Sequence, residues 1–114
     1  MNKNLLAEIE KLVNKKKITE AQIELSKLGE EYNNNAEYLY LRGKIYYLKK
    51  LYYAAIDALL IALEFEKNEK IYRLLSEIYG VLGNSELNKK IQNPDLRLDA
   101  INELKGQLTG IYRI

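Results

Sequence analysis

The feature of this sequence that most constrains its fold is a repeat of its apolar residues after 34 positions. A shift by 34 superposes four pairs of small or apolar residues, which are Leu5 on Leu39, Leu12 on Tyr46, Ala21 on Ala55 and Leu25 on Leu59. A further shift by 33 takes Gly43 to Ser76 and Tyr46 to Tyr79, which indicates a weaker third unit. A period of this length is typical of solenoids, which stack one supersecondary unit on the next.

Within each period the apolar residues recur at spacings of three and four, which predicts amphipathic helices. Clusters of Asn, Gly and Lys separate the expected helices, which span residues 3–14, 18–31, 36–49, 52–66, 69–82, 85–92 and 94–112. Asn93-Pro94-Asp95 predicts the start of the last helix, because Asn is a favoured N-cap and Pro a favoured first residue. No stretch alternates with the period of a strand. The predicted fold class is therefore all-α, a solenoid of about seven antiparallel helices.

Residues 36–69 resemble one tetratricopeptide repeat and read AEYLYLRGKIYYLKKLYYAAIDALLIALEFEKNE. The family pattern is a bulky residue, two spacers, Leu-Gly, two spacers and Tyr, followed by a second-helix Ala with Phe four residues later. The matching residues here are Leu39, Arg42-Gly43, Tyr46, Ala55 and Leu59. Arg42 departs from the family Leu, and Lys67 stands where proline usually closes the repeat.

The resemblance implies one domain, residues 1–114, built as a right-handed solenoid of helical hairpins. Its repeats would span residues 2–35, 36–69 and 69–93, and residues 94–114 would form a capping helix. That helix carries an apolar stripe of Leu98, Ile101, Leu104, Leu108 and Ile111, with Arg97, Asp99, Glu103, Lys105 and Arg113 off it. We interpret the stripe as the seal of the last repeat. The alternative is a surface for self-association.

Catalysis finds little support in the composition. The chain has no cysteine and no histidine, which removes thiol chemistry, the commonest metal ligand and the usual proton-transfer group. It also lacks a Gly-x-Ser-x-Gly turn and a phosphate-binding glycine loop. We therefore expect no enzymatic activity, no cofactor and no metal site.

The charge and hydropathy patterns point to an ordinary globular protein. A net charge of +2 is too small for a general nucleic-acid binder, so nucleic acid is an unlikely partner by this criterion. Glu8 and Glu10 interrupt the N-terminal apolar stretch, so no secretory signal is expected. The longest apolar run, residues 58–63, is too short to span a bilayer. We expect a soluble cytoplasmic protein without a membrane partner.

The resemblance also implies that the first helix of each repeat lines a concave groove. The implied lining residues are Tyr40, Lys44, Tyr47 and Leu48 in the second repeat, and Lys70, Arg73 and Glu77 in the third. The equivalent positions of the first repeat include Leu6 and Val13. Tyr and Arg are enriched at binding hot spots, so the predicted partner is a peptide or helix of another protein, acidic or containing aromatic residues. The competing interpretation is that such tyrosines pack between helices, as we expect for Tyr46.

Lysines cluster at two expected helix turns, Lys15-Lys16-Lys17 and Lys49-Lys50. The simplest interpretation is a pair of solvated turns, and the alternative is a docking edge for an acidic protein or nucleic acid. The leading functional hypothesis is an interaction module, a scaffold or adaptor that binds a partner in its groove. The alternative is a structural homo-oligomer that associates through its Tyr-rich central repeat or its C-terminal helix.

Overall fold

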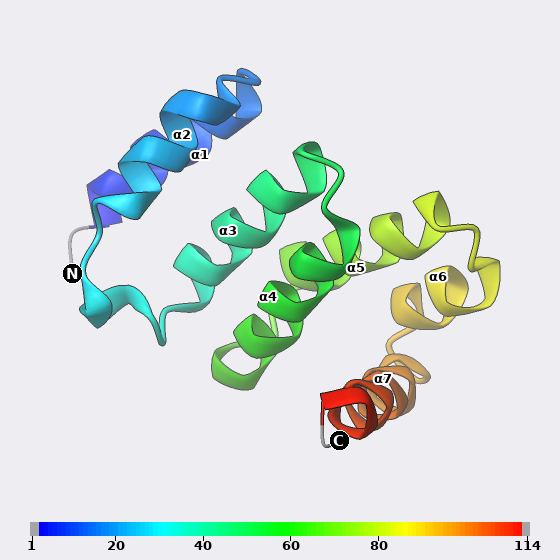
Figure 1. The fold of residues 1–114 in the computed structure, drawn as a ribbon. Coiled ribbons are helices and arrows are strands. Elements are labelled where there is room, and N and C mark those ends of the chain that lie inside the picture. Colours follow the sequence, from blue (N-terminus) through cyan, green and yellow to red (C-terminus); the bar gives the residue numbers. More distant parts are fainter. Residues whose placement is uncertain (1–2, 113–114) are drawn as a thin grey trace. The chain divides into compact units, whose positions relative to one another are not determined.

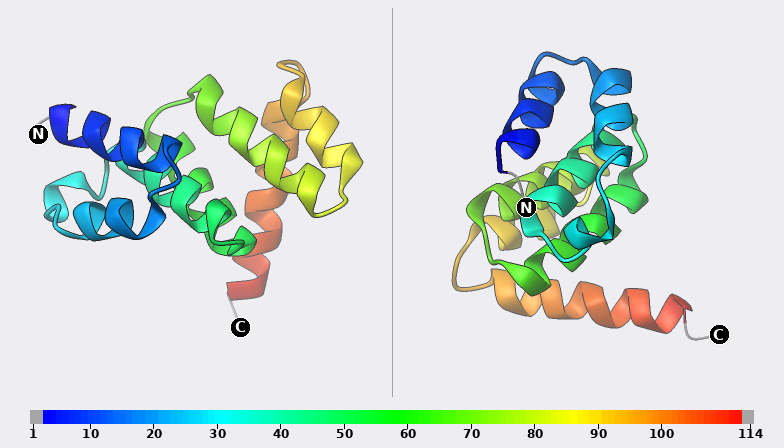
Figure 2. Two further views of the ribbon diagram at one scale, coloured as in Figure 1. Left: turned by 90° about the horizontal axis from the view of Figure 1, so that it is seen from above. Right: turned by 90° about the vertical axis from the view of Figure 1, so that its left-hand side faces the viewer.

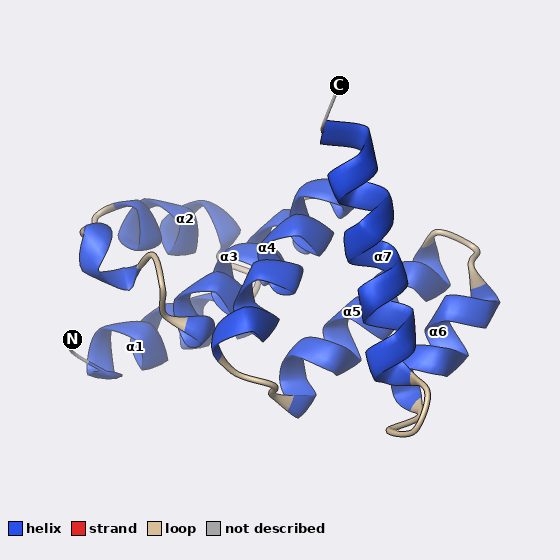
Figure 3. Ribbon diagram, turned by 90° about the horizontal axis from the view of Figure 1, so that it is seen from below, coloured by secondary structure: helices blue, strands red, loops and turns tan. Residues whose placement is uncertain are grey.

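The computed structural model describes the backbone of residues 3–112 and the side chains of residues 5–106. Over that part of the chain all regular structure is helical, as Figure 3 shows. Its elements are α1 (Lys3–Asn14), α2 (Ile18–Ser26), the 3₁₀ turn η1 (Glu30–Tyr32), α3 (Ala36–Leu48), α4 (Tyr52–Phe65), α5 (Glu69–Val81), α6 (Ser85–Gln92) and α7 (Arg97–Tyr112) (Figure 1). The predicted all-α class with seven α-helices is confirmed for these residues.

The chain divides into two compact units, Met1–Lys67 and Asn68–Ile114. The first unit holds α1 to α4 and the second holds α5 to α7. Their boundary lies next to the predicted junction of the second and third repeats. Figure 2 shows that α1 and α2, α3 and α4, and α5 and α6 each form an antiparallel hairpin.

Five of the predicted helices have the observed boundaries to within one residue, namely α1, α3, α4, α5 and α6. The helix predicted for residues 18–31 ends early, at Ser26. There the Ser26 hydroxyl donates to the carbonyl of Ile23 at 2.7 Å, and Gly29 is extended. The chain then turns through η1, which places Tyr32 in the core at 2% exposure. Sequence periodicity missed this break because Leu28 continued the apolar pattern.

The last helix begins at Arg97, three residues after the predicted start at Pro94. Asn93, predicted as the N-cap of this helix, is instead the C-cap of α6. Its side chain accepts the backbone N–H of Asp95 at 2.9 Å, and its carbonyl accepts the N–H of Arg97 at 2.9 Å. These two bonds close the turn of residues 94–96, which precedes the helix, so the predicted N-cap position was wrong.

The three hairpins close with the same turn. Lys16, Lys50 and Gly83 adopt left-handed backbone conformations, with φ of 63°, 64° and 82°. In each turn the N–H of the following residue bonds back five positions, from Lys17 to Leu12 at 2.9 Å, from Leu51 to Tyr46 at 2.8 Å and from Asn84 to Tyr79 at 2.8 Å. This is the Schellman closure of a helix C-terminus. The left-handed residues are separated by 34 and 33 positions, which matches the sequence period.

In the first unit, α1 and α2 both pack on α3. Their shared core consists of Leu6, Ile9, Val13, Ala21, Leu25, Tyr32, Leu41 and Ile45. The helices α3 and α4 approach closely at Gly43, where an added Cβ would lie 2.9 Å from both Cγ and Cδ2 of Leu59. The absence of a side chain at Gly43 therefore permits this close contact. Tyr46 is only half-buried, and its hydroxyl accepts a 3.3 Å hydrogen bond from Arg42 Nε.

In the second unit, α5 packs on α6, and α6 contacts α7. The buried residues of α7 with described side chains are Ala100, Ile101 and Leu104. The predicted stripe was wrong at Leu98, which is 54% exposed. Counting back by three and four from Leu104 gives Ile101, Ala100 and Arg97, so the inward face bypasses Leu98. Leu108 and Ile111 lie outside the residues whose side chains are described.

Candidate functional site

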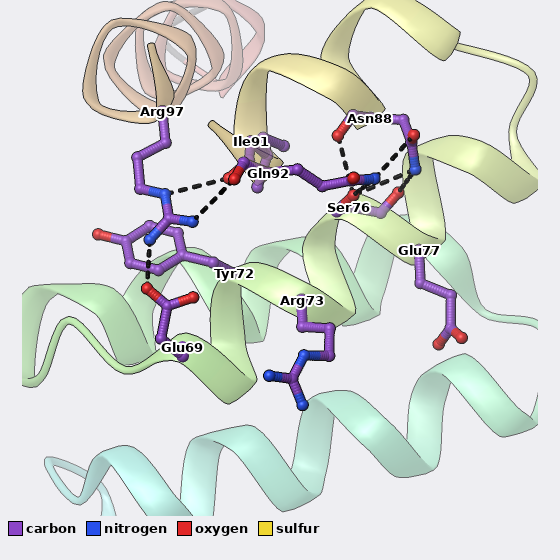
Figure 4. Close-up of a pocket in the computed structure, with 9 residues that line it drawn as sticks. All are labelled: Glu69, Tyr72, Arg73, Ser76, Glu77, Asn88, Ile91, Gln92 and Arg97. Atoms are coloured by element: carbon purple, nitrogen blue, oxygen red, sulfur yellow. Dashed lines mark hydrogen bonds and ion pairs between the residues drawn. The ribbon is translucent and has the colours of Figure 1, made fainter. Parts of the chain in front are cut away.

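A pocket of about 350 Å³ opens in the second unit (Figure 4). Its walls come from α5, α6 and the first residue of α7. The lining residues are Glu69, Tyr72, Arg73, Ser76, Glu77, Asn88, Ile91, Gln92 and Arg97. Seven of these side chains are polar or charged and one more is a tyrosine, so the pocket is suited to polar recognition.

The floor of the pocket is a closed hydrogen-bond network around Ser76, which is 3% exposed. The Ser76 hydroxyl donates to the carbonyl of Asn88 at 2.9 Å and accepts from Gln92 Nε2 at 2.9 Å. Asn88 Nδ2 donates to the carbonyl of Ser76 at 2.6 Å, and Gln92 Nε2 also donates to Asn88 Oδ1 at 3.0 Å. No buried side-chain nitrogen or oxygen of the described residues lacks a partner. The network therefore holds α5 and α6 in one fixed arrangement.

Arg97 forms one wall of the pocket. Its guanidinium carbon lies 4.2 Å from the ring centroid of Tyr72, and its Nε donates to the carbonyl of Ile91 at 3.1 Å. Its Nη1 forms a 2.6 Å ion pair with Glu69 Oε1. The flat guanidinium stacks with its face on the Tyr72 ring and donates hydrogen bonds from its edge. These two kinds of contact together fix the plane of the group.

These contacts also set the ionisation of the neighbouring groups. The hydrogen bond from Arg97 holds the pKa of Glu69 below its ordinary value. Burial raises the pKa of Tyr72, and the positive charge of Arg97 opposes that rise. Near neutral pH this wall therefore carries a carboxylate, a guanidinium and an uncharged phenol.

Arg73 and Glu77 form the edge of the pocket. Both are exposed and lie one helical turn apart on α5. Figure 4 shows that both side chains point away from Gln92 and Arg97. Of the three residues predicted in this unit, Arg73 and Glu77 thus line one pocket. Lys70 is half-buried and lies outside the lining set.

The four predicted groove residues of the first unit are all half-buried. Tyr40 and Leu48 pack against the core, so each has a structural role. The ammonium of Lys44 lies 5.9 Å from the ring centroid of Tyr47, and that ring lies 6.0 Å from the ring of Tyr52. The structure therefore brings Lys44 and Tyr47 together and adds Tyr52, which sequence reasoning missed.

Two groove positions of the first repeat were predicted wrongly. Leu6 is 5% exposed and Val13 is 1% exposed, and both belong to the core shared with α3. Both helices of the first hairpin pack on α3, so the face of α1 that carries Leu6 and Val13 is turned towards this core. Large aliphatic residues at these positions already favoured burial over recognition.

The lysines of the two predicted turns are all exposed. Figure 1 shows the turn between α1 and α2 and the turn between α3 and α4 at the same end of the first unit. Lys49 Nζ donates to Gln22 Oε1 at 3.1 Å, which links this end to α2. The arrangement agrees with solvated turns.

Sequence reasoning also missed the polar floor and wall of the pocket, although one signal was present. Asn88 and Gln92 occupy, after the shift by 33, the positions of Ala55 and Leu59. Polar residues at two positions that are buried in the preceding hairpin indicate an internal hydrogen-bond network. Arg97 gave no such signal.

No known family model, curated protein or solved structure matches this chain. Among the described residues, no group of acidic side chains could hold a metal ion. Over the same residues, every helix is too short or too polar to cross a membrane.

Proposed function

We propose that this chain is a helical-repeat protein of the tetratricopeptide type and binds a peptide or helix of another protein. One observation carries the proposal: three helical hairpins close with the same left-handed turn at intervals of 34 and 33 residues. Helical-repeat proteins in general present extended surfaces that bind other molecules. The polar groups of the pocket floor bond to one another, which supports recognition better than catalysis.

The pocket of the second unit is the proposed contact site. Arg73 is exposed at its edge, while Arg97 and Tyr72 form a rigid wall. A fixed wall lowers the entropy that a ligand must overcome on binding. Arginine and tyrosine offer large contact areas together with a charge or a hydroxyl. The ligand that suits these groups is an acidic segment, or one that carries an aromatic residue.

The test is selection of peptides from a displayed random library on the immobilised protein. Each selected peptide is then titrated by fluorescence anisotropy against the parent and against Arg73→Ala. We expect Arg73→Ala to weaken binding by about 30-fold, the loss typical of a hot-spot residue, with an unchanged melting temperature. Lys89→Ala is the matched control, because Lys89 is exposed on the neighbouring α6 and does not line the pocket.

Failure to enrich any peptide would contradict the proposed function. So would equal affinities for the parent and Arg73→Ala, because the contact would then lie elsewhere. A fall in melting temperature for Arg73→Ala would assign the residue to the packing of the unit and not to recognition.

A further inference from the structure

A second and larger groove lies on the outer face of the first hairpin, between α1 and α2. Its volume is about 700 Å³, and its lining residues are Leu5, Glu8, Ile9, Lys11, Leu12, Lys15, Glu20, Ile23, Glu24, Lys27 and Leu28. We call this surface the outer groove. It is lined by α1, α2 and the residues directly after α2. Ile9 also belongs to the core shared with α3, whereas Leu6, Val13 and Leu25 belong to that core alone.

The outer groove exposes apolar surface. Leu5 is 41% exposed and Ile23 is 50% exposed. Leu12 and Leu28, which line the same groove, are half-buried. Contiguous apolar surface rimmed by charges is typical of an interaction site. A hairpin that is covered on one side only also leaves an apolar face for a further helix layer.

The charges on the two rims of the outer groove are opposite in sign. From the turn outward, the α1 rim carries Lys15, Lys11 and Glu8. In the same direction the α2 rim carries Glu20, Glu24 and Lys27, because the two helices run antiparallel. The order is therefore positive, positive, negative on α1 and negative, negative, positive on α2. Lys27, directly after α2, forms an ion pair with Glu24 in which both side chains are exposed, so both charges remain available at the surface.

We propose that two copies of this chain pair through their outer grooves, face to face, as a symmetric four-helix bundle. A two-fold axis parallel to the helices places α1 of each copy opposite α2 of the other, with both turns at the same end. At each of the three charged positions along a rim, the residue of one copy then faces a residue of opposite charge in the other copy. In a two-fold interface every contact occurs twice, so this one charge order stabilises the dimer at both rims.

The charge order is the reason to prefer a second copy over an unrelated helix. A single foreign helix would meet both rims at once and would need a different charge on each of its sides. A second copy of the hairpin supplies that pattern without any further requirement. This inference concerns the first unit and does not depend on peptide binding in the second.

The experiment measures solution mass by sedimentation over about 10 to 500 µM, a range in which mass action moves a moderate dimer between its states. The parent chain should reach the dimer mass at the upper end. Ile23→Glu should raise the dimer dissociation constant by about 30-fold or more, because it places a charge in the apolar seam. Tyr53→Glu is the matched control, since Tyr53 is 77% exposed on α4 and lies outside the outer groove.

Charge exchange gives the sharper test. Lys11→Glu with Lys15→Glu makes both rims acidic, and Glu20→Lys with Glu24→Lys makes both rims basic. Each double variant alone should stay monomeric, and an equimolar mixture should form the heterodimer. Circular dichroism on each variant checks that the exposed substitutions leave the helices folded.

Three results would overturn the proposal. These are a parent chain that stays monomeric over the whole range, a mixture of the two double variants that stays monomeric, and a dimer that Tyr53→Glu weakens as much as Ile23→Glu does. A monomeric parent that still binds selected peptides would reject the dimer and leave the proposed function standing.

Discussion

The second hairpin, α3 and α4, and the third hairpin, α5 and α6, hold their helices together by different means at three equivalent positions. A shift by 33 takes Gly43, Ala55 and Leu59 to Ser76, Asn88 and Gln92. In the second hairpin the absence of a side chain lets Leu59 approach within 2.9 Å of the Cβ position of residue 43. In the third hairpin the same positions are joined by hydrogen bonds of 2.6 to 3.1 Å.

The difference shows that one backbone arrangement can be specified either by shape or by polar geometry. A close apolar contact tolerates little added volume, because the facing helix has no room to move. A hydrogen-bond network around a buried hydroxyl tolerates added volume at its exposed edge but not the loss of a member, since the remaining donors lose a partner. The two hairpins should therefore fail under opposite kinds of substitution.

The largest effect is expected for Gly43→Leu. The new side chain would meet Leu59 and the carbonyl of Ala55, so α3 and α4 must separate. We expect a loss of about 3 kcal/mol in the free energy of unfolding, the upper end of the range for overpacking. The measurement is chemical denaturation followed by circular dichroism. Gly106→Ala is the control, because nothing lies within 4 Å of its Cβ position, and it should leave stability equal or slightly higher.

The next effect is expected for Ser76→Ala. This change removes one of the two acceptors of Gln92 Nε2 and one of the two acceptors of Asn88 Nδ2, and it should cost about 2 kcal/mol. Combining Ser76→Gly with Asn88→Ala and Gln92→Leu rebuilds the Gly, Ala and Leu set of the second hairpin, which should recover most of that loss. If the triple variant is less stable than Ser76→Ala alone, the two hairpins are not interchangeable at these positions.

A smaller effect is expected at the turns, where the hairpins differ again. Lys50 holds a left-handed conformation that favours glycine, whereas Gly83 holds the same conformation without strain. Lys50→Gly should therefore raise the free energy of unfolding by about 1 kcal/mol, and Gly83→Ala should lower it by about 1 kcal/mol. Thermal melts of both variants test this pair. Changes of equal sign would contradict the shared turn.

The smallest effect concerns the pH dependence of Glu69, which has a lowered pKa in the folded chain. A carboxyl group whose pKa is lower in the folded than in the unfolded chain stabilises the folded chain. This stabilisation is complete at pH values above the unfolded-state pKa, and it is lost as the pH falls through the folded-state pKa. Glu69→Gln should thus flatten the fall in melting temperature between about pH 5 and pH 3. Glu86→Gln is the comparison, because the pKa of Glu86 is also lowered, by Lys90 on the same helix. An unchanged pH profile for Glu69→Gln would mean that its pair with Arg97 is not kept in solution.

Much of the fold could be predicted because its signals are local. Asn35, Asn68 and Asn84 cap the starts of α3, α5 and α6 with side-chain hydrogen bonds of 2.8 to 3.1 Å. The Asn clusters that separated the predicted helices were therefore the caps themselves. The early end of α2 could not be predicted in this way, since Tyr32 is placed by its burial in a core made from three helices.

The site was less predictable because it depends on contacts that are distant in sequence. Leu98 fitted an apolar stripe and Arg97 did not, yet Leu98 is exposed while the Arg97 side chain is only 12% exposed. Hydropathy ranks an arginine as a surface residue. It does not register that a guanidinium stacked on Tyr72 and bonded to backbone carbonyls can replace an apolar side chain on the inward face.

The placement of Arg97 has a consequence for the way the second unit opens. This residue begins α7, stacks on a ring of α5 and bonds the carbonyls of Ile91 and Gln92 at the end of α6. An isolated helix of 8 residues, the length of α6, is not stable in water. Unravelling of α6 from its C-terminal end must therefore release the first turn of α7 and uncover Tyr72. In native-state hydrogen exchange, the amide protons of α6, of the first turn of α7 and of the turn of α5 around Tyr72 should accordingly exchange together, as one cooperative unit. The three helices should not fray one at a time.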